Sequence, residues 1–245
     1  MLARRQNMYK FFWEHEIYFW KIRHNGKKMS DQIKQKKDKK MKVEVIERVD
    51  VSGNAICFER YESALPLANF DHNAKYKFAC KGCPTYGKNL SCPPYSPTFL
   101  QYLDGVKSAK VICFRLPLDY FNHLMAEEKY RDGFRKARSL LVNELLEYRE
   151  KGYAVAGSGA CLACERCVAE TSDEHCKNPT KQIYSLESLG VNVVALVKRC
   201  FDINLEWTDA ERTADHVCAV GAVFFEDEDL VDDGQNSSCP KTDLS

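Results

Sequence analysis

Three cysteines spaced three residues apart, with a fourth following, limit most strongly what this chain can fold into. The run is Cys161-x2-Cys164-x2-Cys167-x8-Cys176. Three thiolates from one short loop can converge on the irons of a cubane cluster, and the fourth can arrive from a longer excursion of the chain. The fold must therefore hold this loop open around a cofactor. We expect these four cysteines to bind a [4Fe–4S] cluster.

The run is close to the bacterial ferredoxin pattern C-x2-C-x2-C-x3-C-P, although its last spacer is longer and Pro179 is displaced. Four sulfur ligands also suit zinc, which stays open as an alternative cofactor. Against zinc, structural zinc sites normally take two ligands from each of two knuckles, and this run takes three from one loop. Arg166 and Lys177 within the run either offset the charge of an anionic cluster or are ordinary surface charges.

A second cysteine group precedes this run. It consists of Cys80-x2-Cys83-Pro84 and Cys92-Pro93-Pro94, and its prolines stiffen a loop that must keep thiolates in register. Iron–sulfur and zinc are both open for this group. It supplies only three cysteines, so the fourth position is either open or filled from elsewhere, by Cys57, Cys113, Cys200 or Cys218, by an oxygen or nitrogen ligand such as His72, or by a crossing Cys176. Cys113 and Cys218 lie in apolar strands and are expected to be small buried hydrophobic residues.

The composition limits the cellular compartment and the classes of partner that we expect for this protein. Twelve cysteines in 245 residues fall below the share found in disulfide-stapled proteins. Glu14, His15 and Glu16 stand where a signal peptide would have its apolar core, so we expect a cytoplasmic protein with reduced thiols. A net charge of +1 gives no indication of a nucleic-acid partner, and no apolar stretch is long enough for a membrane span. The expected partner is a redox protein or a small cofactor.

The charge is unevenly distributed along the chain. Residues 1–40 contain 12 Lys/Arg and 4 Asp/Glu, together with many aromatic residues. They could form a basic, aromatic membrane anchor, but we expect a disordered or mis-annotated extension, with translation beginning at Met41 or Met29. Residues 41–226 are expected to form a metal-binding domain, and residues 227–245 an acidic disordered tail.

Hydrophobic periodicity predicts strands over residues 42–49, 55–59, 110–118, 153–156, 191–197 and 216–225. It predicts helices over residues 97–106 and 124–151, and a short helix between Ser185 and Gly190. Strands alternating with helices favour an α/β fold, with α+β possible. We expect a central mixed sheet flanked by helices, with the cysteine-rich metal loops at strand ends.

Three segments together resemble a family of uncharacterised prokaryotic proteins, known only as predicted metal-binding and common in anaerobes. They are the stretch from Cys80 to Pro94 (CKGCPTYGKNLSCPP), the stretch from Cys161 to Cys167 (CLACERC), and Asn178-Pro179 with the stretch from Tyr184 to Val191 (YSLESLGV). The resemblance covers roughly residues 41–226. It implies metal ligation by seven cysteines: Cys80, Cys83, Cys92, Cys161, Cys164, Cys167 and Cys176.

The resemblance implies no established reaction, so the expected function depends on the cysteine spacing. We expect one or two [4Fe–4S] clusters that act in electron transfer or in a small reductase. The alternative is a non-catalytic zinc- or metal-binding module with a structural or metal-carrier role.

Overall fold

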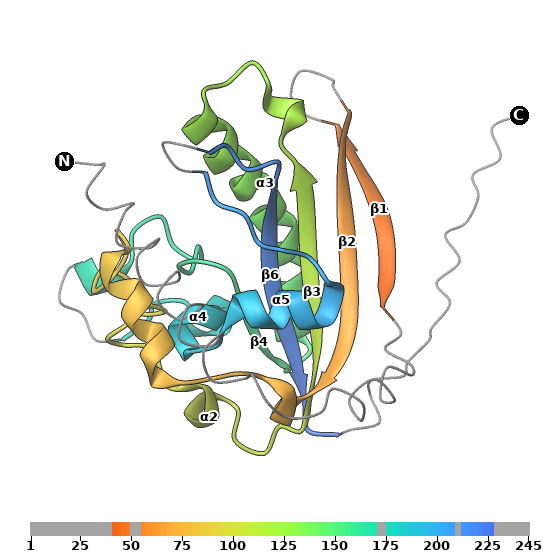
Figure 1. Cartoon of the computed structure of the whole chain (residues 1–245). Helices are drawn as coiled ribbons and strands as arrows, with labels where there is room; N and C mark the ends of the chain where they lie inside the picture. The colour runs from red at the N-terminus through yellow and green to blue at the C-terminus, as the bar shows by residue number, and fades with distance from the viewer. Residues whose placement is uncertain (1–40, 50–54, 171–174, 209–211, 228–245) are drawn as a thin grey trace, which may run out of the picture.

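A six-stranded sheet forms the centre of the molecule (Figure 1). The computed structural model describes residues 41–49, 55–170, 175–208 and 212–227. The strands follow the order β1 (Lys42–Val49), β2 (Ala55–Pro66), β3 (Ser108–Pro117), β6 (His216–Phe225), β4 (Ala154–Gly157), β5 (Tyr184–Ser185). Neighbouring strands are antiparallel, except that β4 and β5 are parallel. The predicted central mixed sheet of an α/β protein is confirmed.

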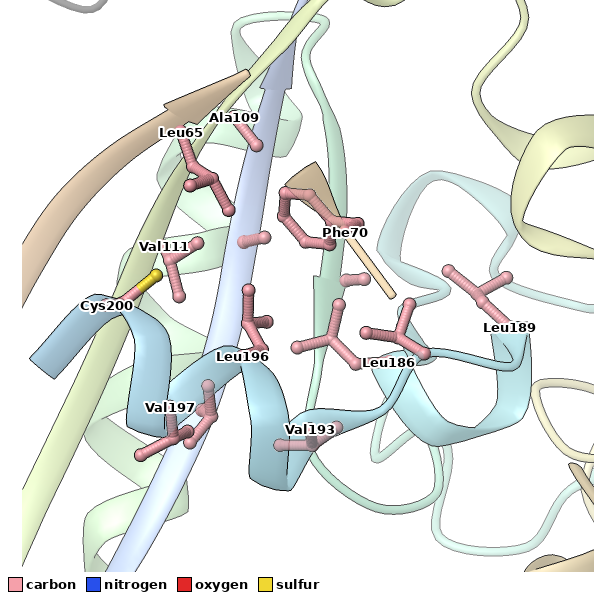
Figure 2. Close-up of a cluster of buried hydrophobic side chains, with 14 of the residues drawn as sticks. Leu65, Phe70, Ala109, Val111, Leu186, Leu189, Val193, Leu196, Val197 and Cys200 are labelled. Carbon is pink, nitrogen blue, oxygen red and sulfur yellow. The ribbon is translucent and has the colours of Figure 1, made fainter. Parts of the chain in front are cut away.

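Helices cover both faces of the sheet. The long helix α3 (Ala126–Glu150) lies on one face, and α5 (Val193–Phe201) crosses the other (Figure 1). The short helices α2 (Phe99–Tyr102) and α4 (Leu186–Leu189) pack on the same side as α5. Each interface has its own cluster of buried apolar side chains, because alternate residues of a strand point to opposite faces of the sheet. Figure 2 shows the cluster between α4, α5 and the strands.

Helix α3 forms where the sequence predicts a helix. Four residues at four-residue steps, Gly133, Ala137, Leu141 and Leu145, are buried against the sheet. The helix ends before Gly152, whose φ of +92° is a conformation that favours glycine. Among the predicted strands, β1 and β6 have the predicted bounds, β3 and β4 match within two residues, and β2 continues seven residues beyond its predicted end.

The predicted strand over residues 191–197 is wrong, because this segment enters helix α5. Its run of apolar and β-branched residues suits a buried strand, but the apolar positions also follow the helical spacing. Asn192 caps the helix by accepting a hydrogen bond from Ala195 N–H (3.1 Å). The buried residues of α5 then share one face, and they are Val193, Leu196, Val197, Cys200 and Phe201.

The predicted helix over residues 97–106 is also wrong in its bounds. The helix there, α2, is a single turn capped by Thr98. Thr98 and Gln101 form a capping box, in which each side chain bonds to the backbone of the other residue. The Ser96 hydroxyl instead donates to the Ser188 carbonyl (2.7 Å), so it joins two segments of the fold.

Five 3-10 helices complete the described structure: η2 (Leu67–Asn69), η3 (Ala74–Gly82), η4 (Asp119–Phe121), η5 (Val168–Glu170) and η6 (Pro179–Lys181). No helix in the part of the chain that the structure describes is long and apolar enough to cross a membrane. The predicted extension over residues 1–40 and all but the first residue of the predicted tail over residues 227–245 lie outside the described residues.

Candidate metal centre

The four cysteines of the ferredoxin-like run line one hollow. The run begins four residues after β4 ends, so the strand delivers this loop to its place. Cys176 returns to the same hollow after the longer spacer, as the sequence predicts. The rest of the lining comes from Asn89, Leu90, Ala163 and Gln182.

Three sulfur atoms in this hollow accept hydrogen bonds. The Leu90 N–H donates to Cys167 Sγ (3.3 Å), and the Ala163 N–H donates to Cys161 Sγ (3.4 Å). Asn178 Nδ2 donates to Cys164 Sγ (3.0 Å). Such bonds favour the thiolate, which is the form that ligates metals. Burial raises the pKa of Cys176, and the charges of the other three cysteines raise it further, so four bare thiolates together are unfavourable here.

The cysteines of the other group also lie together. Cys80 is in η3, and the chain turns at once into Cys83, whose N–H donates to the Cys80 carbonyl (2.9 Å). Thr85 Oγ1 lies between two thiols, 3.1 Å from Cys83 Sγ and 3.6 Å from Cys92 Sγ. Burial raises the pKa of Cys80 to about 12, with further increases from Glu187, Cys83 and Cys92. A metal would have to displace this proton to bind.

A short segment, residues 89–92, joins the two cysteine groups, and we call it the linking segment. Asn89 Nδ2 donates to the Cys161 carbonyl (3.2 Å), and the Cys161 N–H donates to Ser91 Oγ (2.8 Å). The same segment supplies Leu90 N–H to Cys167 and contains Cys92 itself. Asn89 also accepts from the backbone and the hydroxyl of Ser91, which fixes the turn. The two groups therefore share a wall.

Arg138 of α3 supplies a half-buried positive charge near cysteines of both groups. Its guanidinium donates to the Ser158 carbonyl (2.6 Å) and to the Ala160 carbonyl. Burial lowers the pKa of Arg138, while the negative charges of Cys161, Cys92 and Glu187 raise it in part. The sequence interpretation considered Arg166 and Lys177 for charge compensation.

Arg166 and Lys177 are more exposed than the half-buried Arg138. Arg166 is 81% exposed and pairs with Glu170 (3.3 Å), as an ordinary surface charge does. Lys177 is exposed as well. Arg138 could not be found from the motif, because it lies in a different element, helix α3, well before the run.

The structure places the six sequence candidates for a fourth ligand as follows. Cys176 lines the hollow of the ferredoxin-like run, away from the group of Cys80. Cys200 packs in the core beside Val111 (Figure 2), and the ring of His72 stacks on Phe99, with 4.8 Å between ring centroids. The remaining three are on strands of the sheet, with Cys57 exposed on β2, Cys113 buried on β3 and Cys218 half-buried on β6.

Cys218 has a polar environment that the sequence interpretation missed. Its neighbours Cys113 and His216 hydrogen-bond to it, and these bonds lower the pKa of Cys218 despite its burial. The bond to Cys218 in turn raises the pKa of His216. The expectation that Cys113 is a small buried hydrophobic residue agrees with its complete burial, but Cys218 is part of a thiol–imidazole pair. The sequence contained one signal for this pair: His216 and Cys218 are two residues apart on a strand, so their side chains lie on the same face of the sheet.

A larger cavity of about 250 Å³ adjoins the hollow. Cys161 and Ala163 line both spaces. Arg138 and Lys181 contribute positive charge to the cavity, and apolar side chains such as Val142 and Ile183 complete its wall. A molecule in this cavity would therefore touch the residues that hold the cysteine loop.

Within the described ranges, no three His, Cys, Asp or Glu side chains stand close enough to ligate one single metal ion as they are. The four thiols of the run instead surround a volume. A [4Fe–4S] cluster occupies a volume and binds each thiolate through a different iron, so this donor set and its shape fit such a cluster.

These features define a cysteine-rich α/β protein with two adjoining thiol groups, one of them in the loop that follows strand β4. Residues 63–225 match the model of the family described as "Predicted metal-binding protein (DUF2284)", and the chain belongs to this family. The matched residues include both cysteine groups and exclude β1. No curated protein and no solved structure matches the chain.

Proposed function

We propose that this protein binds [4Fe–4S] clusters and acts as a small reductase or electron-transfer protein. Cys161, Cys164, Cys167 and Cys176 would hold one cluster, and the group at Cys80, Cys83 and Cys92 would hold a second. The observation that carries the proposal is the common hollow of the four cysteines, with hydrogen bonds donated to three of their sulfurs.

The shape of the hollow favours a cluster over zinc. A structural zinc ion binds four sulfurs at about 2.3 Å, which brings those sulfurs around a single point. The hollow also has Asn89, Leu90 and Gln182 in its wall, and no three of the described His, Cys, Asp or Glu side chains stand close enough to hold one ion. Three ligands from one short loop are typical of a cluster, whereas structural zinc sites take two ligands from each of two knuckles.

The residues around the hollow have distinct roles in this proposal. A bound cluster supplies one-electron chemistry. The hydrogen bonds from Leu90, Ala163 and Asn178 stabilise negative charge on the sulfurs, which makes the reduced state more accessible. Arg138 offsets part of the remaining charge from its half-buried position.

The adjoining cavity favours a reductase with a small substrate or cofactor. It shares Cys161 with the hollow, so a bound molecule would lie beside a ligand of the cluster. Arg138 and Lys181 would attract an anionic group, and Val142, Leu146 and Ile183 would contact an apolar part.

The test is anaerobic purification followed by iron and sulfide analysis. We expect a brown protein with broad absorption near ~400 nm and about four or eight irons per chain. Cys164→Ser should remove about four irons, whereas Cys57→Ser, at an exposed position on β2, should remove none. Colourless protein with stoichiometric zinc would overturn the proposal, and so would equal iron loss in the two variants.

A further inference from the structure

A buried carboxylate lies beside the incomplete cysteine group. Glu187 is in the first turn of α4, and its Oε2 is buried without a hydrogen-bond partner among the described residues. Leaving a buried acceptor unpaired costs about 1–3 kcal/mol, and more if the group is charged. A fold keeps such a residue at this cost where the residue has another task.

Helix α4 is fixed against the segment that carries Cys80. The Ser96 hydroxyl donates to the Ser188 carbonyl (2.7 Å), and the Asn73 N–H donates to the Gly190 carbonyl (2.8 Å). Gly190 has a φ of +90°, and a Cβ there would lie 2.8 Å from the Asn73 carbonyl oxygen. The close approach of α4 to η3 therefore depends on this glycine.

The negative charge of Glu187 acts on the cysteine group of Cys80 and raises the pKa of the Cys80 thiol. Its charge acts on Cys80 more strongly than Cys83 or Cys92 does. Burial raises the pKa of Glu187, and a bond from the Ser185 side chain and the charge of Arg138 oppose this only in part. The guanidinium of Arg138 itself bonds to the Ser158 and Ala160 carbonyls. Lys77, the other cation near Cys80, donates to the carbonyls of Ser96 (2.8 Å) and Pro97 (3.2 Å). Both cations therefore have carbonyl partners, and among the described residues Oε2 has none.

We propose that the Glu187 carboxylate is the fourth ligand of the metal cofactor held by Cys80, Cys83 and Cys92. This inference rests on the proposed function for the identity of the cofactor, but not for the position of the ligand. Three thiolates and one carboxylate would make one metal position chemically different from the others. Oxygen is a harder ligand than sulfur, so this position would exchange ligands most readily. The carboxylate would then acquire the partner that the apoprotein lacks.

The test uses the full chain with Cys164→Ser, in which the other group cannot hold its cluster. In this background we compare Glu187→Gln, Glu187→Cys and Glu150→Gln, an exposed control on α3. We expect Glu187→Gln to lower bound metal at least twofold. Glu187→Cys should retain the metal, and the control should not change it. With 57Fe, Mössbauer spectra should show one distinct iron position in the chain that keeps Glu187, and equivalent iron positions in the Glu187→Cys chain.

Thermal unfolding of the metal-free proteins separates ligation from a structural role. An unpaired buried carboxylate destabilises the apoprotein, so apo Glu187→Gln should melt at the same temperature as its parent or higher. A lower melting temperature together with unchanged metal content would overturn the inference. A Cys164→Ser chain that binds no metal would also overturn it.

Failure of the ligand inference can be told apart from failure of the proposed iron–sulfur function. If the Cys164→Ser chain contains zinc instead of iron, the iron–sulfur proposal fails for this group. Loss of that zinc in Glu187→Gln would still support Glu187 as the ligand, and retention of zinc would refute it.

Discussion

At the scale of single residues, the thiol–imidazole pair of Cys218 and His216 lies on the sheet face covered by α5. His216 Nε2 is 3.2 Å from the Asn204 carbonyl, and its Nδ1 is 3.5 Å from Glu206 Oε2 and 3.4 Å from Arg115. Arg115 also pairs with Glu59 (2.8 Å). Cys218 thus faces one imidazole and one guanidinium, and both favour its thiolate.

The Cys218 thiol and the His216 imidazole change the stability of the fold with pH in opposite directions. The lowered pKa of Cys218 stabilises the folded state above the pKa of the unfolded thiol, and this contribution is lost as the pH falls through the folded pKa. The raised pKa of His216 stabilises the folded state below the pKa of the unfolded imidazole, and this contribution is lost as the pH rises through the folded pKa. The ion pair is therefore complete only between the two folded pKa values.

We predict that Cys218 is alkylated with a pH midpoint well below 9.0, the ordinary value for a thiol. Peptide-resolved mass spectrometry after a short iodoacetamide pulse at each pH measures this midpoint. Cys113→Ala removes the largest favourable hydrogen bond, so it should move the midpoint upward. An unchanged midpoint in Cys113→Ala would contradict this account of the Cys218 thiolate.

At the scale of elements, the close packing of α3 on β6 and β4 depends on Gly221. A Cβ there would lie 2.8 Å from the Ala156 carbonyl oxygen and 2.9 Å from Leu145 Cδ1. The oxygen belongs to the backbone of β4 and cannot move without shifting the strand that carries the cysteine loop.

We predict that Gly221→Ala lowers the free energy of unfolding by about 2–3 kcal/mol, because the fully packed interface has no room for the methyl group. The control is Gly152→Ala at the end of α3, where nothing lies within 4 Å and only the φ of +92° is unfavourable. It should cost about 1 kcal/mol. Urea denaturation of the two variants gives the comparison, and equal losses would show that the backbone contact at Gly221 is unimportant.

At the scale of the whole molecule, Arg138 connects the long helix to both cysteine groups. If the proposed clusters are bound, we predict that Arg138→Gln lowers their reduction potential by tens of millivolts or more, because a half-buried positive charge favours added electrons. Arg138→Lys, which keeps the charge but not the planar fork, should lower the potential less. Arg166→Gln, at the exposed surface pair, should change it little. Potentiometric titration followed by EPR measures all three, and equal shifts for Arg138→Gln and Arg166→Gln would refute the role of Arg138.

The sequence predicted those parts of the fold where one periodicity was unambiguous. Helix α3 repeats its apolar residues along its whole length, and β6 is a continuous apolar strand, so both have nearly their predicted bounds. The segment from Val191 to Val197 failed because a short β-branched run fits either period, and only the Asn192 cap and the packing of α5 decide between them.

The candidate site was predictable only where its residues are local in sequence. Cysteine spacing marked both groups as candidates, and Cys176 lines the same hollow as the three closely spaced cysteines. Arg138 and Glu187 come from α3 and α4 and reach the cysteines only through tertiary packing. No spacing rule connects such residues to a motif, and an ordinary arginine or glutamate in a helix gives no separate signal.

The linking segment has a consequence for how the apoprotein matures. Residues 89–92 give a backbone donor to one thiol group and a side chain to the other, so ordering either site builds a wall of its neighbour. Cofactor insertion would then be concerted: chains that have received their first cofactor would take up the second more readily than empty chains take up either.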